Sequence, residues 1–214
     1  MSISYFNHNA LKSMRASAYK GTHYALAELI DNSFDAKATK CKIILIEKVD
    51  SKRKNKYIMD RILVCDNGIG MSDEQLNICL QIGGTNNGVD EDRIKNKKIG
   101  KFGFGLPSAS LNQCRDTKVI SWDKPNNYRK SRLDFDALME EKTVDMPKIQ
   151  SCSIDTELNE KLEACIDKRH GTIVSWEKCD QLTWITAKST IENTARSCGQ
   201  IFRHYLKDGR SIEF

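Results

Sequence analysis

The stretch that decides the fold is YALAELIDNSFDAKAT, residues 24–39. Its apolar residues recur at helical intervals, which predicts an amphipathic helix that ends near Asp35. We expect Thr22 to cap the N-terminus of this helix. Glu28 and Asn32 are four residues apart, so a helix places them one turn apart on one face. Such a face can offer a base for a water and an oxygen ligand for a hard cation, although a solvated surface helix has the same spacing.

Composition sets broad limits on the rest of the chain. With 214 residues, 39% of them hydrophobic, the chain can bury a core as one large or two small domains. The net charge of +5 permits anionic partners without requiring them. The eight cysteines form no C-x-x-C pair, which argues against zinc and against a disulfide framework, and for a reducing compartment. No signal sequence or transmembrane-length apolar run occurs, so we expect a soluble cytoplasmic protein with no membrane partner.

The remaining pattern predicts a mixture of strands and helices. Strands are expected at residues 40–48, 57–65, 118–122, 128–134 and 172–177, and helices at residues 10–20, 72–80, 104–112 and 187–206. Ser72 is placed to cap the second of these helices. In the last helix we expect a buried stripe of Ile191, Ala195, Cys198, Phe202 and Tyr205. Residues 143–169 form a polar excursion with a helix near residues 158–166, and the strand-like SIEF at residues 211–214 indicates an N-terminal part of a longer protein.

A turn with two glycines follows the second predicted strand. Residues 66–71, DNGIGM, begin with Asp66 and contain Gly68 and Gly70. Glycines let a ligand approach the backbone closely, and a buried carboxylate can accept a hydrogen bond from an exocyclic amine. Met71 offers a soft apolar wall for a flat ring. Taken alone, the motif also fits an ordinary turn between a strand and a helix.

A second glycine-rich segment, GKFGFGL at residues 100–106, opens a predicted helix. Backbone N–H groups in such loops and at helix N-termini bind phosphate oxygens. The segment is not a P-loop, because G-x-x-x-x-G-K-[ST] occurs nowhere in the chain, and its glycine order differs from the Rossmann fingerprint. A third motif, His170-Gly171-Thr172, enters the strand predicted at residues 172–177 and is ordinary by itself.

Together, and in this order, the motifs resemble the GHKL ATPase superfamily of gyrase B, the heat-shock chaperone, histidine kinases and MutL. The resemblance rests on Glu28 and Asn32, then DNGIGM, then GKFGFG, then Gly171-Thr172, and covers about residues 11–206. The stretches AELIDNSFDAKAT and IGKFGFGLPSASL are most similar to MutL and to the MORC ATPases.

The resemblance implies a role for each matching residue. Glu28 would be the general base that activates the attacking water, and Asn32 would be the protein ligand to Mg²⁺. Asp66 would read the adenine amino group, with Thr172 supporting it through a water. The base pocket would be lined by Gly68, Gly70 and Met71. The triphosphate would be wrapped by the second glycine box, Gly100, Lys101, Phe102, Gly103, Phe104 and Gly105.

The resemblance also implies an architecture, the Bergerat-type ATP-binding fold. This is an α/β (α+β) two-layer sandwich, a mixed β-sheet with helices on one face, and here it would be a single domain over residues 1–214. Residues 82–105 would form the ATP lid. Either phosphate or solvent could be the partner of the lid cations, Arg93, Lys95, Lys97, Lys98 and Lys101.

The implied function is ATP binding and Mg²⁺-dependent hydrolysis to ADP, with the nucleotide driving homodimerisation in a larger DNA-related or defence protein. In the MutL-like branch a lysine of the following domain reaches the γ-phosphate, so we expect slow hydrolysis by these 214 residues. Nucleic acid could bind through other domains.

Three alternatives remain open. A histidine-kinase-type catalytic domain is disfavoured by Glu28 and by the lack of a preceding phospho-acceptor helix. A nucleotide-gated interaction module without turnover is opposed only by Glu28. A domain that binds DNA by charge would need a basic stripe, which the sequence does not locate; the charged turn SKRKNK at residues 51–56 is interpreted as a solvated hairpin tip.

Overall fold

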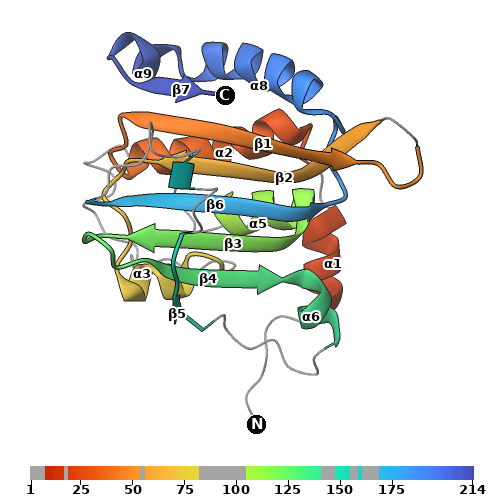
Figure 1. Cartoon of the computed structure of the whole chain (residues 1–214), viewed down its shortest axis with the longest axis horizontal. Coiled ribbons are helices and arrows are strands. Elements are labelled where there is room, and N and C mark those ends of the chain that lie inside the picture. Colours follow the sequence, from red (N-terminus) through yellow and green to blue (C-terminus); the bar gives the residue numbers. More distant parts are fainter. Residues whose placement is uncertain are drawn as a thin grey trace.

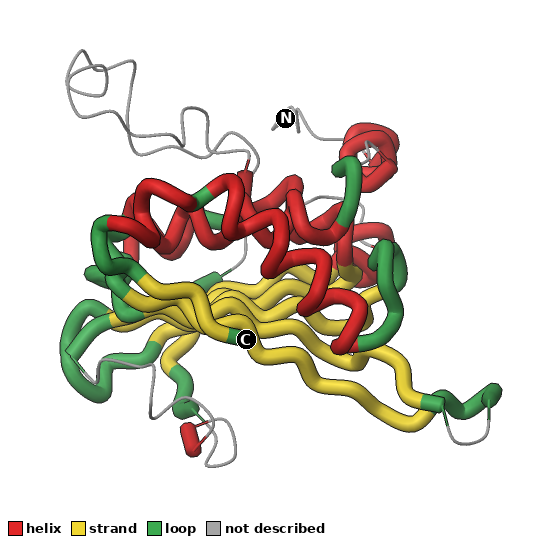
Figure 2. The backbone as a smooth tube through the Cα atoms, turned by 90° about the horizontal axis from the view of Figure 1, so that it is seen from above, coloured by secondary structure: helices red, strands yellow, loops and turns green. Residues whose placement is uncertain are grey.

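A seven-stranded sheet, with helices packed on one face, is the framework of the chain (Figure 1). Seen along the sheet, the helices form a second layer above the strands (Figure 2). The computed structural model describes residues 8–16, 19–53, 56–81, 105–140, 148–154, 159–160 and 169–214. The expected two-layer sandwich with a mixed sheet is therefore confirmed.

The sheet runs in the order β5-β4-β3-β6-β2-β1-β7, with all neighbours antiparallel except the parallel pair of β1 and β7. Its strands are β1 (Lys40–Val49), β2 (Tyr57–Asp66), β3 (Cys114–Trp122), β4 (Arg129–Asp134), β5 (Gln150–Ser151), β6 (Gly171–Cys179) and β7 (Ser211–Glu213). The helices are α1 (His8–Ala16), α2 (Thr22–Asp35), α3 (Asp73–Ile78), α5 (Gly105–Gln113), α6 (Phe135–Glu140), α8 (Ala187–Ile201) and α9 (Arg203–Lys207).

Helix α2 lies in the middle of the helical layer and supplies much of the core. Leu26, Leu29, Ile30 and Phe34 are all nearly inaccessible to solvent, as the helical spacing of the sequence predicts. Fully burying one such side chain stabilises the fold by about 1.5–3 kcal/mol, so this stripe fixes α2 against the sheet.

The N-terminus of α2 differs from the prediction. Gly21 is the N-cap residue, and no side chain caps the helix there. The Thr22 hydroxyl instead donates to Gln113 Oε1 at 2.7 Å and accepts from the Thr183 N–H at 2.8 Å. Thr22 therefore joins α2 to the end of α5, because a buried hydroxyl needs partners from whichever element packs on it.

The capping prediction for α3 is confirmed. Ser72 Oγ accepts from the Gln75 N–H at 3.3 Å, and Gln75 Oε1 accepts from the Ser72 N–H at 2.9 Å. This reciprocal capping box fixes where the chain leaves the 66–71 turn and enters the helix.

At the C-terminus, the single helix predicted over residues 187–206 is two helices, α8 and α9, that meet at Phe202. Ala195 was expected in the core but is exposed, whereas Thr190 and Thr194 are buried. The buried face thus runs through Thr190, Thr194, Cys198 and Phe202, a regular four-residue spacing of mostly small side chains.

Other departures are smaller. The SIEF segment is not an unpaired strand, because Ser211, Ile212 and Glu213 pair with the start of β1. Helix α6 and strand β5 were not predicted, and most of the helix expected near residues 158–166 lies outside the described residues. The described cysteines are free thiols, and none of the described helices is long and apolar enough to cross a bilayer.

Arg15 anchors α1 to the helical layer. Its guanidinium donates to Leu111 O at 2.8 Å and to Cys114 O at 2.6 Å, and it pairs with Asp180. It also lies over the ring of Phe135, 4.9 Å from the centroid. Arg15 is only 5% exposed, so these partners satisfy a charge that would otherwise be costly to bury.

We predict that Arg15→Met lowers the free energy of unfolding by about 2–4 kcal/mol, because two buried carbonyls lose their donor and Asp180 loses one of its two arginine partners, Arg15 and Arg115. Urea denaturation followed by circular dichroism measures the change. Arg203→Met, at an exposed position, is the control and should stay within about 0.5 kcal/mol of the wild type. Equal stability of the two variants would show that Arg15 does not anchor α1.

Candidate functional site

The candidate site begins where three adjacent strands meet at one end of the sheet. Asp66, the last residue of β2, lies opposite Thr172 near the start of β6. Thr172 in turn lies opposite Ser121, near the end of β3. The antiparallel register therefore brings residues that are far apart in sequence onto one edge.

Asp66 is the buried acceptor of this edge, with only 5% of its surface exposed. Its carboxylate accepts from Ser33 Oγ at 3.0 Å and from the Gly68 N–H at 2.8 Å, and the Thr172 backbone N–H adds a third hydrogen bond. Burial raises the pKa of Asp66 to about 6, although these hydrogen bonds act in the opposite direction. A carboxylate has about four acceptor positions, so a further donor, such as an exocyclic amine, can still be bound.

Ser33 was not predicted as a site residue. Its hydroxyl lies 3.0 Å from both Leu29 O and Asp66 Oδ2, and it directly follows Asn32 on α2. Through Ser33, the helix that carries Glu28 and Asn32 is bonded to the buried carboxylate. The available signal was a serine in the apolar stripe of this helix, where a polar side chain needs a partner.

Ser121 was also missed, and it fixes the end of the 66–71 turn. Its hydroxyl accepts from the Met71 N–H at 2.9 Å and lies 3.0 Å from both Gly171 O and the Thr172 hydroxyl. Met71 is half-buried, with its side chain packed against the main core. The hydroxyl of Thr172 is thus already bonded within the protein, next to Asp66.

The turn itself is packed against β6 and β3. Gly68 O lies 2.6 Å from His170 Nδ1. Gly70 has a φ of 71°, and a Cβ atom placed on it would lie 2.1 Å from Trp122 O. Gly70 is therefore required by the backbone conformation and by the close approach of the turn to β3.

Arg129, at the start of β4, clamps the far side of the turn. Its guanidinium donates to Met71 O at 2.8 Å, to Asp73 Oδ1 at 2.6 Å and to Asp123 Oδ1 at 2.8 Å. The side chain is 11% exposed, so these charge-assisted bonds hold the turn, α3 and the β3–β4 connection together.

The second half of the site lies where α5 begins. A Cβ atom placed on Gly105, the first residue of α5, would lie 2.8 Å from Glu28 Oε2 and 4.0 Å from Asn32 Nδ2. Residues from two distant motifs are therefore adjacent, and a side chain at Gly105 would displace the Glu28 carboxylate. Asn32 is exposed beside them, so its amide is accessible to an ion that takes most of its ligands from phosphates and water.

The electrostatics around Glu28 are those of a partly desolvated acid. Burial raises the pKa of Glu28, which makes the carboxylate a stronger proton acceptor than a free one. Burial and then the charge of Glu28 raise the pKa of Tyr19 to about 12. Burial, followed by the charges of Glu28 and Asp35, raises the pKa of Asp31 to about 6.

Comparison with known proteins agrees with this geometry. A family profile described as "Histidine kinase-, DNA gyrase B-, and HSP90-like ATPase" matches residues 19–172. The chain belongs to this ATPase family. The matched region contains Glu28, Asn32, Asp66 and Gly105.

Two kinds of protein are similar to the chain in sequence. Protein MICRORCHIDIA 5 of Arabidopsis thaliana is 28% identical over 106 residues, which are 50% of this chain and 14% of the relative. The DNA mismatch repair protein MutL of Borreliella afzelii is 34% identical over 97 residues, 45% of this chain and 14% of the relative. The expected likeness to MutL and MORC proteins is confirmed, and the chain spans about one seventh of the length of these relatives.

Part of the expected ATPase site lies outside the described residues. This holds for Gly100, Lys101, Phe102, Gly103 and Phe104, and for the lid cations Arg93, Lys95, Lys97 and Lys98. Among the described residues, no group of three His, Cys, Asp or Glu side chains could hold a metal ion.

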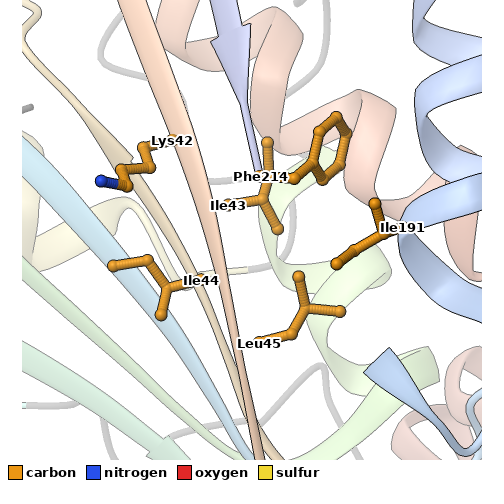
Figure 3. A pocket seen from close by; sticks show the side chains of 6 residues that line it. All are labelled: Lys42, Ile43, Ile44, Leu45, Ile191 and Phe214. Atoms are coloured by element: carbon orange, nitrogen blue, oxygen red, sulfur yellow. The ribbon is translucent and has the colours of Figure 1, made fainter. Parts of the chain in front are cut away.

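An apolar hollow of about 270 Å³ lies beside β1, the strand between β2 and the edge strand β7. Figure 3 shows Ile43, Leu45, Ile191 and Phe214 gathered on one side of the strand, with Lys42 and Ile44 on the other. Among the described residues that line the hollow, Lys42 is the charged one. No residue of the hollow belongs to the site around Asp66 and Glu28.

The raised pKa of Asp66 predicts how the stability of the nucleotide-free chain depends on pH. In the folded chain the pKa is about 6, against an ordinary 3.8, so the stability associated with the protonated form is present at low pH and lost as the pH rises through about 6. We therefore expect the wild type to lose up to about 3 kcal/mol of unfolding free energy, relative to Asp66→Asn, between about pH 4 and pH 7.

Urea denaturation of both proteins across this pH range measures the difference. Asp208→Asn, at an exposed position, should follow the wild type at every pH. A constant difference between the wild type and Asp66→Asn would mean that the carboxylate has the same pKa in the folded and unfolded chain.

Proposed function

We propose that the chain binds ATP with Mg²⁺ between α2, the 66–71 turn and the start of α5, and hydrolyses it with Glu28 as general base. The observation that carries this proposal is the convergence of three motifs on one helix. Gly105 packs against Glu28 and Asn32, while Ser33, the next residue along, is bonded to Asp66. Because α2 contacts both parts of the site, it would fix the distance between the base and the phosphates of a bound nucleotide.

Asp66 is proposed to select adenine. It is a buried acceptor whose present partners are all donors, and it retains room for one more. An exocyclic amino group supplies that donor, whereas a carbonyl at the same place would face the carboxylate with no proton between them. Gly68, Gly70 and Met71 form the turn that would lie along the base, and Thr172 would act beside Asp66.

Glu28 is proposed to accept the proton of the attacking water. Its raised pKa and partial burial suit a general base, because proton transfer to it is more favourable than to a free carboxylate. Asn32 would ligate Mg²⁺, which when bound neutralises charge on the phosphates and orients them. Gly105 begins the helix whose free N–H groups would meet the phosphates. Gly100, Lys101, Phe102, Gly103 and Phe104 would complete this phosphate loop.

The larger context is also a proposal. One relative is a DNA mismatch repair protein and another is a MICRORCHIDIA protein, and each is about seven times longer than the match. We infer that residues 1–214 form one ATPase domain of a longer cytoplasmic protein, in which residues 82–105 close over ATP and the closed form dimerises. Hydrolysis would then reverse the closure and the dimerisation.

The first test of this function concerns binding. Asp66→Asn should weaken the binding of a non-hydrolysable ATP analogue by at least about a hundredfold, because the amide presents a donor where only an acceptor fits. Isothermal titration calorimetry measures the affinity, and Asp208→Asn is the matched control. Wild-type affinity in Asp66→Asn would remove Asp66 from the site.

The second test separates binding from chemistry. Glu28→Gln keeps size and shape but cannot accept a proton, so turnover should fall by about 10²–10⁴-fold while the analogue binds with unchanged affinity. Steady-state phosphate release measures the rate. Asp31→Asn is the control, since it removes a neighbouring carboxylate of the same helix and should change the rate only a few-fold.

Two further results bear on the same test. Asn32→Ala should weaken the Mg²⁺-dependent part of the affinity and leave binding in the presence of EDTA unchanged. If Glu28→Gln hydrolyses ATP as fast as the wild type, Glu28 is not the base; if no variant or wild type hydrolyses ATP at all, the chain is a nucleotide-gated module.

A further inference from the structure

The connection between α2 and β1, residues 36–39, lies between two other segments of the chain. On one side is the 66–71 turn. On the other is the segment that leads into β7, where the Ser211 N–H donates to Thr39 O at 2.9 Å. Strand β7 then pairs with the first residues of β1 (Figure 1). The α2–β1 connection therefore links the turn of the candidate site to the segment around β7.

The 66–71 turn packs directly on this connection. The Ile69 N–H donates to Ala36 O at 2.9 Å. A Cβ atom placed on Gly68 would lie 2.8 Å from the same oxygen and 3.0 Å from the Cβ of Ala36. Gly68 thus meets Ala36 without space for a side chain, so the position of Ala36 determines where the turn lies.

Asn67 joins the turn to the connection a second time. Its Oδ1 accepts from the Thr39 N–H and from the Lys40 N–H, both at 2.9 Å, and its Nδ2 donates to Thr39 Oγ1 at 2.9 Å. Asp66 and Gly68 are its neighbours in the sequence. Asn67 therefore holds the part of the turn that carries the buried carboxylate.

The connection begins in an unfavourable backbone conformation. Lys37 has a φ of 63°, in the left-handed region where a residue with a Cβ atom is strained. Its N–H donates to Phe34 O at 3.0 Å, so this strained residue closes the end of α2. Such a conformation persists only where the surrounding structure holds it. The connection therefore depends on its neighbours for its shape.

Arg210 holds the connection from the side opposite the turn, at the end of α2. Its guanidinium donates to Phe34 O at 3.1 Å, and its Cζ lies 5.2 Å from the centroid of the Phe34 ring and 4.5 Å from that of Tyr205. The carbonyls at a helix C-terminus favour a cation, and the last turn of α2, which the structure describes completely, has none of its own. Arg210 supplies this cation and thereby fixes the turn of α2 that contains Ser33, the partner of Asp66.

We propose that Arg210 and Asn67 are positioning residues for the bound base, which they hold in place through the α2–β1 connection. The inference rests on the proposed function, because it concerns the base half of the same ATP site. Glu28 lies six residues before Phe34 in α2 and is adjacent to Gly105. Loss of either positioning residue should therefore weaken nucleotide binding and leave the hydrolytic step unchanged.

Two substitutions test the two sides of the connection. Arg210→Met keeps an unbranched side chain over the rings but removes the donor and the charge, so an ATP analogue that cannot be hydrolysed should bind about fivefold more weakly. Asn67→Ala removes three hydrogen bonds and should weaken binding by at least about tenfold. Isothermal titration calorimetry measures both affinities. In steady-state phosphate release, KM should rise by the same factors while kcat stays within about twofold of the wild type.

Two further variants separate positioning from general damage. Asn67→Asp keeps the acceptor for the Thr39 and Lys40 N–H groups, so its affinity should return to within about threefold of the wild type. Arg203→Met removes an arginine from an exposed position of α9 and should bind the analogue like the wild type. Circular dichroism checks that each variant is folded, and the two Asn67 variants carry the test if Arg210→Met does not fold.

Hydrogen exchange in the nucleotide-free protein tests whether Arg210 acts through the connection. The amide of Ile69, which donates to Ala36 O, should exchange at least about threefold faster in Arg210→Met than in the wild type. The amides of β3, in the middle of the sheet, should exchange at the wild-type rate.

Three results would overturn this inference alone. They are wild-type affinity in Arg210→Met or Asn67→Ala, a fall in kcat as large as the rise in KM, and unchanged exchange at Ile69. Failure of the analogue to bind to the wild type would instead overturn the proposed function, and this inference with it.

Discussion

The way in which α2, the 66–71 turn and β6 pack together depends on the cost of keeping a carboxylate out of water. Asp66 is almost completely buried, and an unpaired charge in such a place is strongly unfavourable. The protein meets this cost with donors from three separate parts of the chain: Ser33 on α2, the Gly68 N–H in the turn and the Thr172 N–H on β6. Helix and sheet are therefore held in one relative position by an acidic group.

The position of α2 then determines the rest of the site. Thr22 bonds its first turn to Gln113 at the end of α5, and Gly105 lets the start of α5 approach Glu28. The two helices thus touch at both ends of α5. A shift of α2 along its axis would disturb both contacts and the bond from Ser33 to Asp66, so Glu28 and Asp66 are kept at a constant separation.

Local features of this fold were readable in the sequence, and long-range ones were not. The apolar period of α2, the β-branched strands and the Ser72 capping box depend on neighbouring residues, and they were predicted correctly. Ser121 and Arg129 bond to Met71, which is dozens of residues away from each, so nothing local marks them. Ser33 carried one local signal, its place in the apolar stripe of α2, but its partner Asp66 is 33 residues away. Threonine is common at helix N-caps, but the contacts of Thr22 with α5 and with the segment after β6 outweighed that local preference.

The elevated pKa of Asp66 has a consequence for any ligand that donates to it. Such a ligand favours the ionised carboxylate, so its arrival must lower the pKa and release a fraction of a proton to the solvent near pH 6. The heat of binding would then vary with the ionisation enthalpy of the buffer, and affinity would decline in acid. Ligand binding at Asp66 is in this way linked to the pH of the surroundings through a single buried carboxylate.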